Sequence, residues 1–159
     1  MHEVYDDFLK LDDLSNLIDH LSSDTFPWFL QQKSIVESSK KFDFHFGHNF
    51  YVNDAVNSNY FQLIKPLITQ LKCNSLVRIK ANLYPVQSKI FEPAPHIDQS
   101  FNCRVAVFFL NTNNGYTVVE NKKISSLKNR VVLFDSDKKH FGTGCTDQQF
   151  RITLNFNYI

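Results

Sequence analysis

Three side chains in the second half of the sequence could bind one metal ion together: His96, Asp98 and His140. His96 and Asp98 are two residues apart, and on extended backbone such residues point to the same side, so an imidazole and a carboxylate can reach one ion. Two histidines and one carboxylate on one face of an octahedron leave three positions open, as in non-heme iron(II) sites that use dioxygen. The pattern therefore predicts a metal site with room for a chelating 2-oxo acid and for dioxygen.

An H-x-D pair by itself is weak evidence, because it occurs by chance and would then be a surface turn after Pro93 and Pro95. Two histidines and a carboxylate also serve zinc hydrolases, and a cupin-like zinc or manganese enzyme is one alternative. The order of the set favours iron: the H-x-D pair, several strand-like runs, His140, and then Arg151 on the following run. A guanidinium that faces a pocket needs an anionic partner, and the far carboxylate of a 2-oxo acid matches its planar fork.

The last strand-like run, residues 150–158, has apolar residues at its even positions and polar residues at its odd ones. Arg151, Thr153 and Asn155 therefore share one side of the predicted strand. That side would face water in an ordinary half-exposed strand, but it would line the cavity of a double-layered barrel that encloses a pocket. Because the metal-binding pattern precedes this strand, we predict the second arrangement, with Thr153 as a hydroxyl donor beside Arg151.

The elements that must position these residues fall into two parts. The first part predicts a helix after Asp12 and Asp13, a strand around residues 42–46 with alternating phenylalanines, and a second helix near residues 58–72 that Pro66 kinks or divides. The first helix rests on apolar residues at i, i+3, i+4 and i+7, namely Leu14, Leu17, Ile18 and Leu21.

The second part, residues 76–159, predicts mostly strands. Its β-branched and aromatic runs cover residues 77–84, 103–110, 116–120, 130–134 and 150–158. No linker separates this part from residues 1–75. We therefore expect one domain, mainly β with N-terminal helices, in which the helices and strand of residues 1–75 pack on an antiparallel β-sandwich or jelly-roll core.

Longer segments around these residues resemble a known family. The run N-R-V-V-L-F-D-S-D-K-K-H from Asn129 to His140, F-G-T-G after it, and R-I-T-L-N-F-N from Arg151 are similar to the C-terminal half of the iron(II)/2-oxoglutarate dioxygenases. The similarity is greatest to their prolyl-hydroxylase-like branch and its small phage-encoded members. The segment R-I-K-A-N-L-Y-P, which begins at Arg78, resembles the strand before the first metal ligand. The resemblance covers residues 76–158 and, more loosely, the N-terminal helices.

The resemblance implies a double-stranded β-helix, a distorted jelly roll with the metal between its sheets. It implies that three residues bind Fe(II): His96, Asp98 and His140. The co-substrate 2-oxoglutarate would pair its far carboxylate with Arg151 and form hydrogen bonds with Asn82 and Tyr84. In the family, 2-oxoglutarate and dioxygen are converted to succinate and carbon dioxide while a substrate is hydroxylated; ascorbate is a further candidate cofactor. The single Gly115 in the predicted hairpin, where many prolyl hydroxylases carry paired glycines, weakens the transfer of a prolyl substrate.

Composition narrows the substrate and the compartment. The chain has 17 lysines and arginines against 16 acidic residues, so it lacks the basic footprint of a duplex nucleic-acid binder. Three widely spaced cysteines without a CxxC pair predict reduced thiols in a cytoplasmic protein, in a bacterial host cell if the chain is phage-encoded. No apolar run is long enough for a signal peptide or a membrane span.

We therefore expect an enzyme that hydroxylates a peptidyl side chain, proline included, or a free amino acid or similar small molecule. Oxidative demethylation of a nucleobase and a non-catalytic jelly-roll binding module are the alternatives. Several other polar residues are predicted to be structural: His45 and His48 at strand edges or turns, and Asp135 in the turn before the second histidine ligand. Arg104 leaves two alternatives open, contact with substrate or exposure at an edge. Residues 85–95 are long for a hairpin loop and form a candidate lid.

Overall fold

The computed structural model describes residues 1–32 and 44–159, so Phe42 and Asp43 of the predicted alternating strand lie outside the described residues. The described strands are β1 (His2–Tyr5), β2 (Phe29–Gln32), β3 (Phe44–Val52), β4 (Ala55–Val56), β5 (Leu76–Pro85), β6 (Arg104–Phe109), β7 (Tyr116–Val119), β8 (Lys122–Ser125), β9 (Arg130–Asp135), β10 (His140–Gly142) and β11 (Phe150–Tyr158). The described helices are α1 (Leu11–Leu21), the 3₁₀-helix η1 (Phe61–Ile64) and α2 (Lys65–Gln70).

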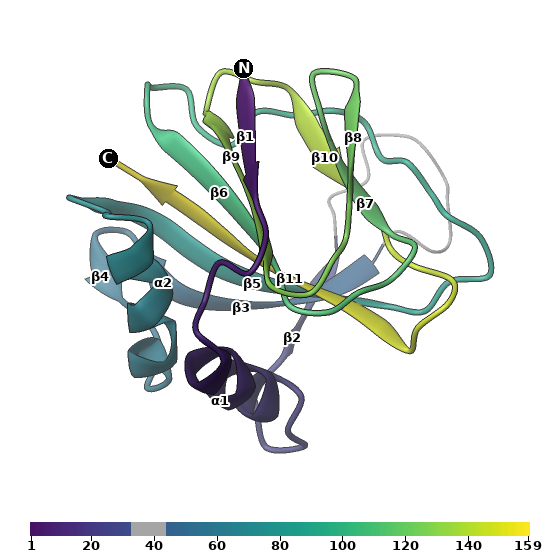
Figure 1. Ribbon diagram of the computed structural model, residues 1–159, viewed down its shortest axis with the longest axis horizontal. Coiled ribbons are helices and arrows are strands. Elements are labelled where there is room, and N and C mark those ends of the chain that lie inside the picture. Colours follow the sequence, from purple (N-terminus) through teal and green to yellow (C-terminus); the bar gives the residue numbers. More distant parts are fainter. Residues whose placement is uncertain (33–43) are drawn as a thin grey trace.

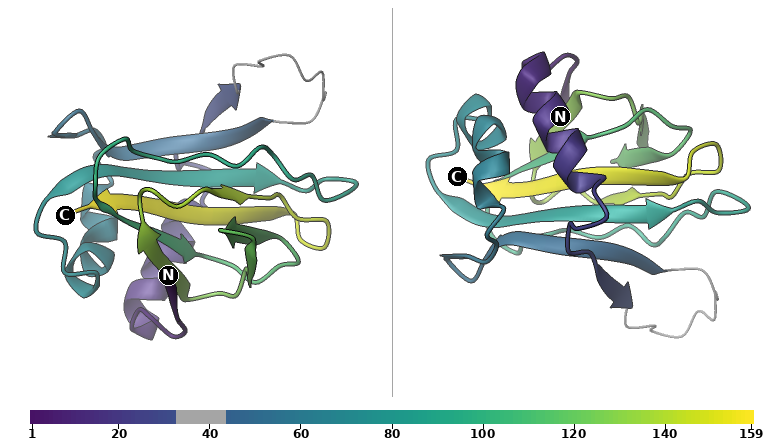
Figure 2. Two further views of the ribbon diagram at one scale, coloured as in Figure 1. Left: turned by 90° about the horizontal axis from the view of Figure 1, so that it is seen from above. Right: turned by 90° about the horizontal axis from the view of Figure 1, so that it is seen from below.

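The strands form two antiparallel sheets. The larger sheet has the order β1-β9-β6-β11-β5-β3-β2, with β4 paired to β3, and the smaller has the order β10-β7-β8. In Figure 1 the smaller sheet lies above β11 and β5, whereas α1 and α2 lie below them. The two views of Figure 2 agree, because the smaller sheet is nearer in one and the helices are nearer in the other. The large sheet is thus covered on one face by helices and on the other by a short sheet.

The two faces of β11 separate the core from the cavity. Even-numbered residues of β11 and odd-numbered residues of β5 pack against the helices, because successive side chains of a strand point to opposite faces. This cluster includes Leu14, Leu17, Leu21, Leu67, Ile79, Ile152, Leu154 and Phe156. A second apolar cluster fills the space between the sheets: Val105, Val107, Phe109, Val119, Ile124, Val132 and Phe134. The remaining polar face of β5 and β11 borders the cavity described below.

Several element boundaries differ from those predicted. The strand runs predicted after residue 76 recur to within one residue at either end. Helix α1 begins at Leu11, so Asp12 and Asp13 lie in its first turn instead of before it, where carboxylates favour the positive end of the helix dipole. Pro66 divides the second predicted helix, because η1 precedes it and α2 begins beside it.

Five short strands were not predicted: β1, β2, β4, β8 and β10. Two of them, β1 and β8, carry mainly exposed residues at the edges of their sheets and show no apolar alternation. Within the part of the chain that the structure describes, no helix is both long and apolar enough to span a membrane.

Candidate functional site

The structure brings His96, Asp98 and His140 together at the open end of the cavity between the sheets. The backbones of His96 and His140 form a β-bridge with N–H to O distances of 3.0 and 2.9 Å, which places their rings side by side. Asp98 Oδ1 lies 3.6 Å from His96 Nε2 and 3.8 Å from His140 Nε2. One ligand atom from each residue lies within 4.8 Å of the other two, so a single ion could contact all three.

The orientation of His140 supports this use. Its Nδ1 lies 3.1 Å from the carbonyl oxygen of Lys138, so the N–H is on Nδ1 and the lone pair is on Nε2. That Nε2 is buried and has no hydrogen-bond partner among the described residues. A buried ring nitrogen without a partner is costly unless something binds it. Two imidazoles and one carboxylate therefore fit a divalent ion such as Fe(II).

Both oxygens of Asp98 are held by the large sheet. Arg78 Nη2 lies 3.0 Å from Oδ1, and Asn157 Nδ2 donates to Oδ2 at 3.1 Å. Burial by itself raises the pKa of the Asp98 carboxyl, but the hydrogen bond with His96 and the charge of Arg78 outweigh it and hold that pKa well below its usual range. Burial lowers the pKa of His140, which Asp98 opposes only in part. The carboxylate and the neutral imidazole are the forms that bind metal.

Arg151 lies at the deep end of the same cavity and is almost completely buried. Its Nε donates to Ser126 Oγ at 3.2 Å, Nη1 to the carbonyl of Thr143 at 2.9 Å, and Nη2 to Thr117 Oγ1 at 3.0 Å. All three acceptors are neutral. Because a guanidinium has five N–H donors, one N–H on each terminal nitrogen has no acceptor among the described residues and is available to a bidentate acceptor. Burial lowers the pKa of Arg151 to about 10, and an incoming carboxylate would offset that cost.

The other residues expected around the co-substrate also line this cavity of about 170 Å³. In the register of β5 and β11, Tyr84 lies opposite Arg151, and Asn82 lies opposite Thr153. The even residues of β5 and the odd residues of β11 thus form one polar wall, which confirms the predicted inward side of the last strand. Asp98 of the metal-binding pattern contacts the same wall through Arg78 and Asn157.

His45 and His48 were wrongly placed at strand edges or turns. Strand β3 lies between β2 and β5, and both side chains are buried. His48 is structural, because Nδ1 contacts the carbonyl of Pro27 at 2.8 Å and Nε2 contacts Ser58 Oγ at 2.7 Å. His45 stacks on Tyr84 with ring centroids 5.1 Å apart and lines the cavity. The alternation of Phe44 and Phe46 predicted that their face of β3 is the buried one, but Phe44 is exposed and His45, on the opposite face, is buried.

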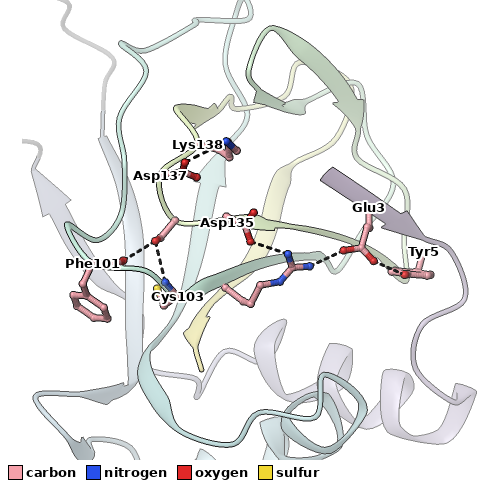
Figure 3. A network of polar contacts seen from close by, with 9 residues as sticks. Glu3, Tyr5, Phe101, Cys103, Asp135, Asp137 and Lys138 are labelled. Atoms are coloured by element: carbon pink, nitrogen blue, oxygen red, sulfur yellow. Dashed lines mark hydrogen bonds and ion pairs between the residues drawn. The ribbon is translucent and has the colours of Figure 1, made fainter. Parts of the chain in front are cut away.

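The two alternatives for Arg104 are decided by its ion-pair partners, Glu3 and Asp135, which Figure 3 labels. Its guanidinium lies between Asp135 and Glu3, with distances of 2.8 and 2.7 Å, away from the cavity. Asp135 is therefore the ion-pair partner of Arg104, whereas His140 Nδ1 contacts the carbonyl of Lys138. Ser136 contacts the segment before β6, whose Phe101 and Cys103 are labelled in Figure 3: the Ser136 hydroxyl donates to the carbonyl of Phe101 and accepts from the N–H of Cys103. These bonds hold the turn that leads into β10.

By sequence, no protein-family model and no curated protein matches the chain. By structure, it is similar to a prolyl hydroxylase from Trichoplax adhaerens in complex with a hypoxia inducible factor oxygen degradation domain peptide fragment, with 15% identity, a TM-score of 0.68, and 99% of this chain and 83% of that chain covered. A 2OG-Fe(II) oxygenase family oxidoreductase from Burkholderia pseudomallei gives 12% identity, a TM-score of 0.73, and 99% and 84% coverage. The viral collagen prolyl hydroxylase of Paramecium Bursaria Chlorella virus-1, solved with 2OG, gives 10% identity, a TM-score of 0.62, and 98% and 93% coverage.

The chain has the fold of the 2OG-Fe(II) oxygenases. This confirms the predicted double-stranded β-helix with N-terminal helices. At 10–15% identity the likeness concerns the fold, and one fold can serve unrelated functions. Any activity therefore depends on the side chains in the cavity of this chain.

Several residues that support the site were not singled out from the sequence. Arg78 and Asn157 could have been found, because they continue the two-residue period of Asn82 on β5 and of Arg151 on β11. The holders of the Arg151 guanidinium could not: Thr117, Ser126 and Thr143. They come from the smaller sheet and its flanking turns, and only the fold of one sheet over the other brings them to β11.

Proposed function

We propose that this protein is an iron(II)- and 2-oxoglutarate-dependent dioxygenase that hydroxylates a peptidyl side chain or a free amino acid. One observation carries the proposal: His96, Asp98 and His140 converge at one end of a cavity whose other end holds a buried guanidinium, that of Arg151. A metal site alone would also suit a zinc or manganese enzyme. The arginine, buried among neutral acceptors and aimed at the same cavity, adds the need for an anion.

The chain's own residues would bind and orient the reactants. His96, Asp98 and His140 would hold Fe(II), and the free fork of Arg151 would accept the far carboxylate of 2-oxoglutarate. Asn82, Thr153 and the phenol of Tyr84 stand on the wall between these two ends. When bound, the metal and 2-oxoglutarate supply the oxidising chemistry with dioxygen, yielding succinate and carbon dioxide.

The size of the cavity bears on the substrate. At about 170 Å³ it is smaller than the roughly 300 Å³ and above that is usual for a drug-sized ligand. Its volume suits a small dicarboxylate better than a co-substrate and a second large molecule together. The substrate would therefore place only its reacting carbon inside and keep the rest at the rim, as a side chain of a peptide can. Similarity to a prolyl hydroxylase solved with a peptide supports the same class.

The test is formation of succinate from 2-oxoglutarate with Fe(II), measured against panels of peptides, proline-rich ones included, and free amino acids, with and without ascorbate. We expect a peptide or an amino acid to stimulate succinate formation and to gain one oxygen atom by mass spectrometry. Asp98→Ala and Arg151→Met should each abolish the stimulated rate, and His20→Ala, at an exposed histidine far from the cavity, should retain it. Absence of succinate in the presence of Fe(II) and every panel member would contradict the proposal.

A further inference from the structure

Two cross-strand neighbours of the large sheet hold the carboxylate of Asp98 from both of its oxygens. Arg78 on β5 lies opposite Asn157 on β11 in the strand register. The guanidinium of Arg78 is 3.0 Å from Oδ1, and the amide of Asn157 donates to Oδ2 at 3.1 Å. Oδ1 also faces the Nε2 atoms of the two histidines, at 3.6 and 3.8 Å. The carboxylate is therefore fixed with one oxygen toward the imidazoles and the other toward the sheet.

Both holders carry an unsatisfied atom that the fold alone does not explain. Arg78 Nε and Asn157 Oδ1 are buried, and neither has a hydrogen-bond partner among the described residues. A buried polar atom without a partner lowers stability and calls for an explanation. The Asn157 side chain is completely buried, where an apolar residue of the same size would pack without this cost. The hydrogen bond from Asn157 to Asp98 explains why an amide occupies this buried position.

We propose that Arg78 and Asn157 are positioning residues that make Asp98 a one-oxygen ligand of the metal. The inference rests on the proposed function, because it assigns these residues a role toward the Fe(II) of that site. If Asp98 bound through both oxygens, two of the six octahedral positions would go to one residue. With Oδ2 retained by Asn157, the protein supplies three ligand atoms and leaves three positions for the co-substrate and dioxygen. The role of Arg78 is to stop the carboxylate from rotating about its own axis.

The experiment compares metal binding by the full chain and by single variants without turnover. Mn²⁺ affinity is measured by titration calorimetry, and the visible absorption of bound Co²⁺ reports the number of ligands. We expect Asn157→Leu and Arg78→Met each to weaken Mn²⁺ binding about tenfold or more, the usual effect of losing a residue that orients a ligand. We also expect each variant to change the Co²⁺ spectrum. Arg78→Lys, which retains a donor and the charge, should recover most of the affinity.

The matched control is Arg104→Met. Arg104 also pairs with an aspartate, Asp135 at 2.8 Å, but on the side away from the cavity, so its loss should leave Mn²⁺ affinity and the Co²⁺ spectrum unchanged. Asn157→Leu removes an unsatisfied acceptor but also takes the donor away from Asp98 Oδ2, so its melting temperature is measured beside its metal affinity. If Arg78→Met does not fold, Arg78→Lys and Asn157→Leu decide the question.

Two kinds of failure are distinguishable. If the wild-type chain binds Mn²⁺ and 2-oxoglutarate but Asn157→Leu and Arg78→Met bind both as tightly, with an unchanged Co²⁺ spectrum, the positioning role is wrong and the proposed function stands. If the wild-type chain binds no divalent metal, the proposed function fails first and this inference fails with it.

Discussion

The backbone of Gly115 lies directly against the side chain of Arg151. A Cβ atom at position 115 would lie 2.7 Å from Arg151 Cδ and 2.5 Å from the carbonyl oxygen of Gly144. These distances are shorter than any ordinary contact, and the carbonyl belongs to backbone that cannot swing away. The φ angle of Gly115 is not positive, so the backbone conformation does not require a glycine here. The lack of a side chain is needed instead because Arg151 and the carbonyl of Gly144 lie so close. The single glycine that the sequence offered in this hairpin makes room for the arginine of the pocket.

The first prediction follows from this contact. Gly115→Ala should displace Arg151, lower the free energy of unfolding by about 1–3 kcal/mol as overpacking does, and weaken 2-oxoglutarate binding to the Mn²⁺-loaded protein. Gly142→Ala is the graded control, because its Cβ would lie 3.3 Å from Arg151 Nη1, a distance that a small shift relieves. Chemical denaturation and calorimetry measure the two effects. If Gly115→Ala binds 2-oxoglutarate as tightly as Gly142→Ala does, Gly115 does not position the arginine.

The second prediction concerns Arg151 itself. Its two free N–H donors would form two charge-assisted bonds to one carboxylate, each worth about 1.5–3 kcal/mol. We expect Arg151→Met to weaken 2-oxoglutarate binding by roughly 100-fold or more and Arg151→Lys to lose less, because a lysine keeps the charge but not the fork. Mn²⁺ affinity should stay near the wild-type value, since the metal residues lie at the other end of the cavity. Calorimetry that shows unchanged 2-oxoglutarate affinity in Arg151→Met would reject the assignment.

The third prediction is a pH dependence. Only the neutral imidazole binds metal, so protons compete with the ion at His140. Burial lowers the pKa of His140 below its ordinary value of 6.5, so Mn²⁺ affinity should vary little above about pH 7 and should fall at lower pH, as His140 gains its proton. The lowered pKa also means that the unfolded chain binds more protons, so the metal-free protein should lose stability as the pH falls below 6.5.

His48 affects only one of these two quantities, the stability of the metal-free protein, and not the affinity for Mn²⁺. Burial lowers its pKa as well, but both ring nitrogens already have partners in the protein. It contributes to the loss of stability at low pH and not to metal binding. An affinity for Mn²⁺ that fell as the pH rose from 6 to 7 would contradict the assignment of His140.

The sequence predicted the site better than its surroundings, for a physical reason. An H-x-D pair and a period-two strand are local, since the geometry of extended backbone alone places His96 beside Asp98 and Arg151 beside Thr153. The remaining parts depend on contacts between segments far apart in the chain. The β-bridge between His96 and His140, and the hydroxyl of Thr117 on Arg151, join residues more than thirty positions apart, and no periodicity encodes them. His45 was misjudged for the same reason.

The fourth prediction concerns the candidate lid, residues 85–95. The start of this segment is tied by backbone bonds from Val86 and Gln87 to the loop before β11. Farther along, the Tyr116 hydroxyl donates to Glu92 Oε1 at 2.5 Å, next to Pro93 on the cavity wall. We expect amide hydrogens of this segment to exchange faster than those of β5 in the free protein. When Mn²⁺ and 2-oxoglutarate are bound, the same amides should exchange more slowly than they do in the free protein. Tyr116→Phe should speed the exchange further. Hydrogen exchange as slow as that of β5 without ligands would rule out a lid.

The last prediction separates the substrate classes. A duplex binder gains most of its affinity from lysines and arginines that neutralise phosphates, and here basic and acidic residues nearly balance. Two arginines outside the cavity are already paired with carboxylates, Arg104 with Asp135 and Arg130 with Asp6. We therefore expect proline-rich peptides or free amino acids to stimulate 2-oxoglutarate turnover at physiological salt, and methylated oligonucleotides to leave it at the basal rate. Asp98→Ala provides the blank for both panels. Stimulation by the oligonucleotides alone, lost as salt is raised, would overturn the peptide assignment and favour nucleobase demethylation.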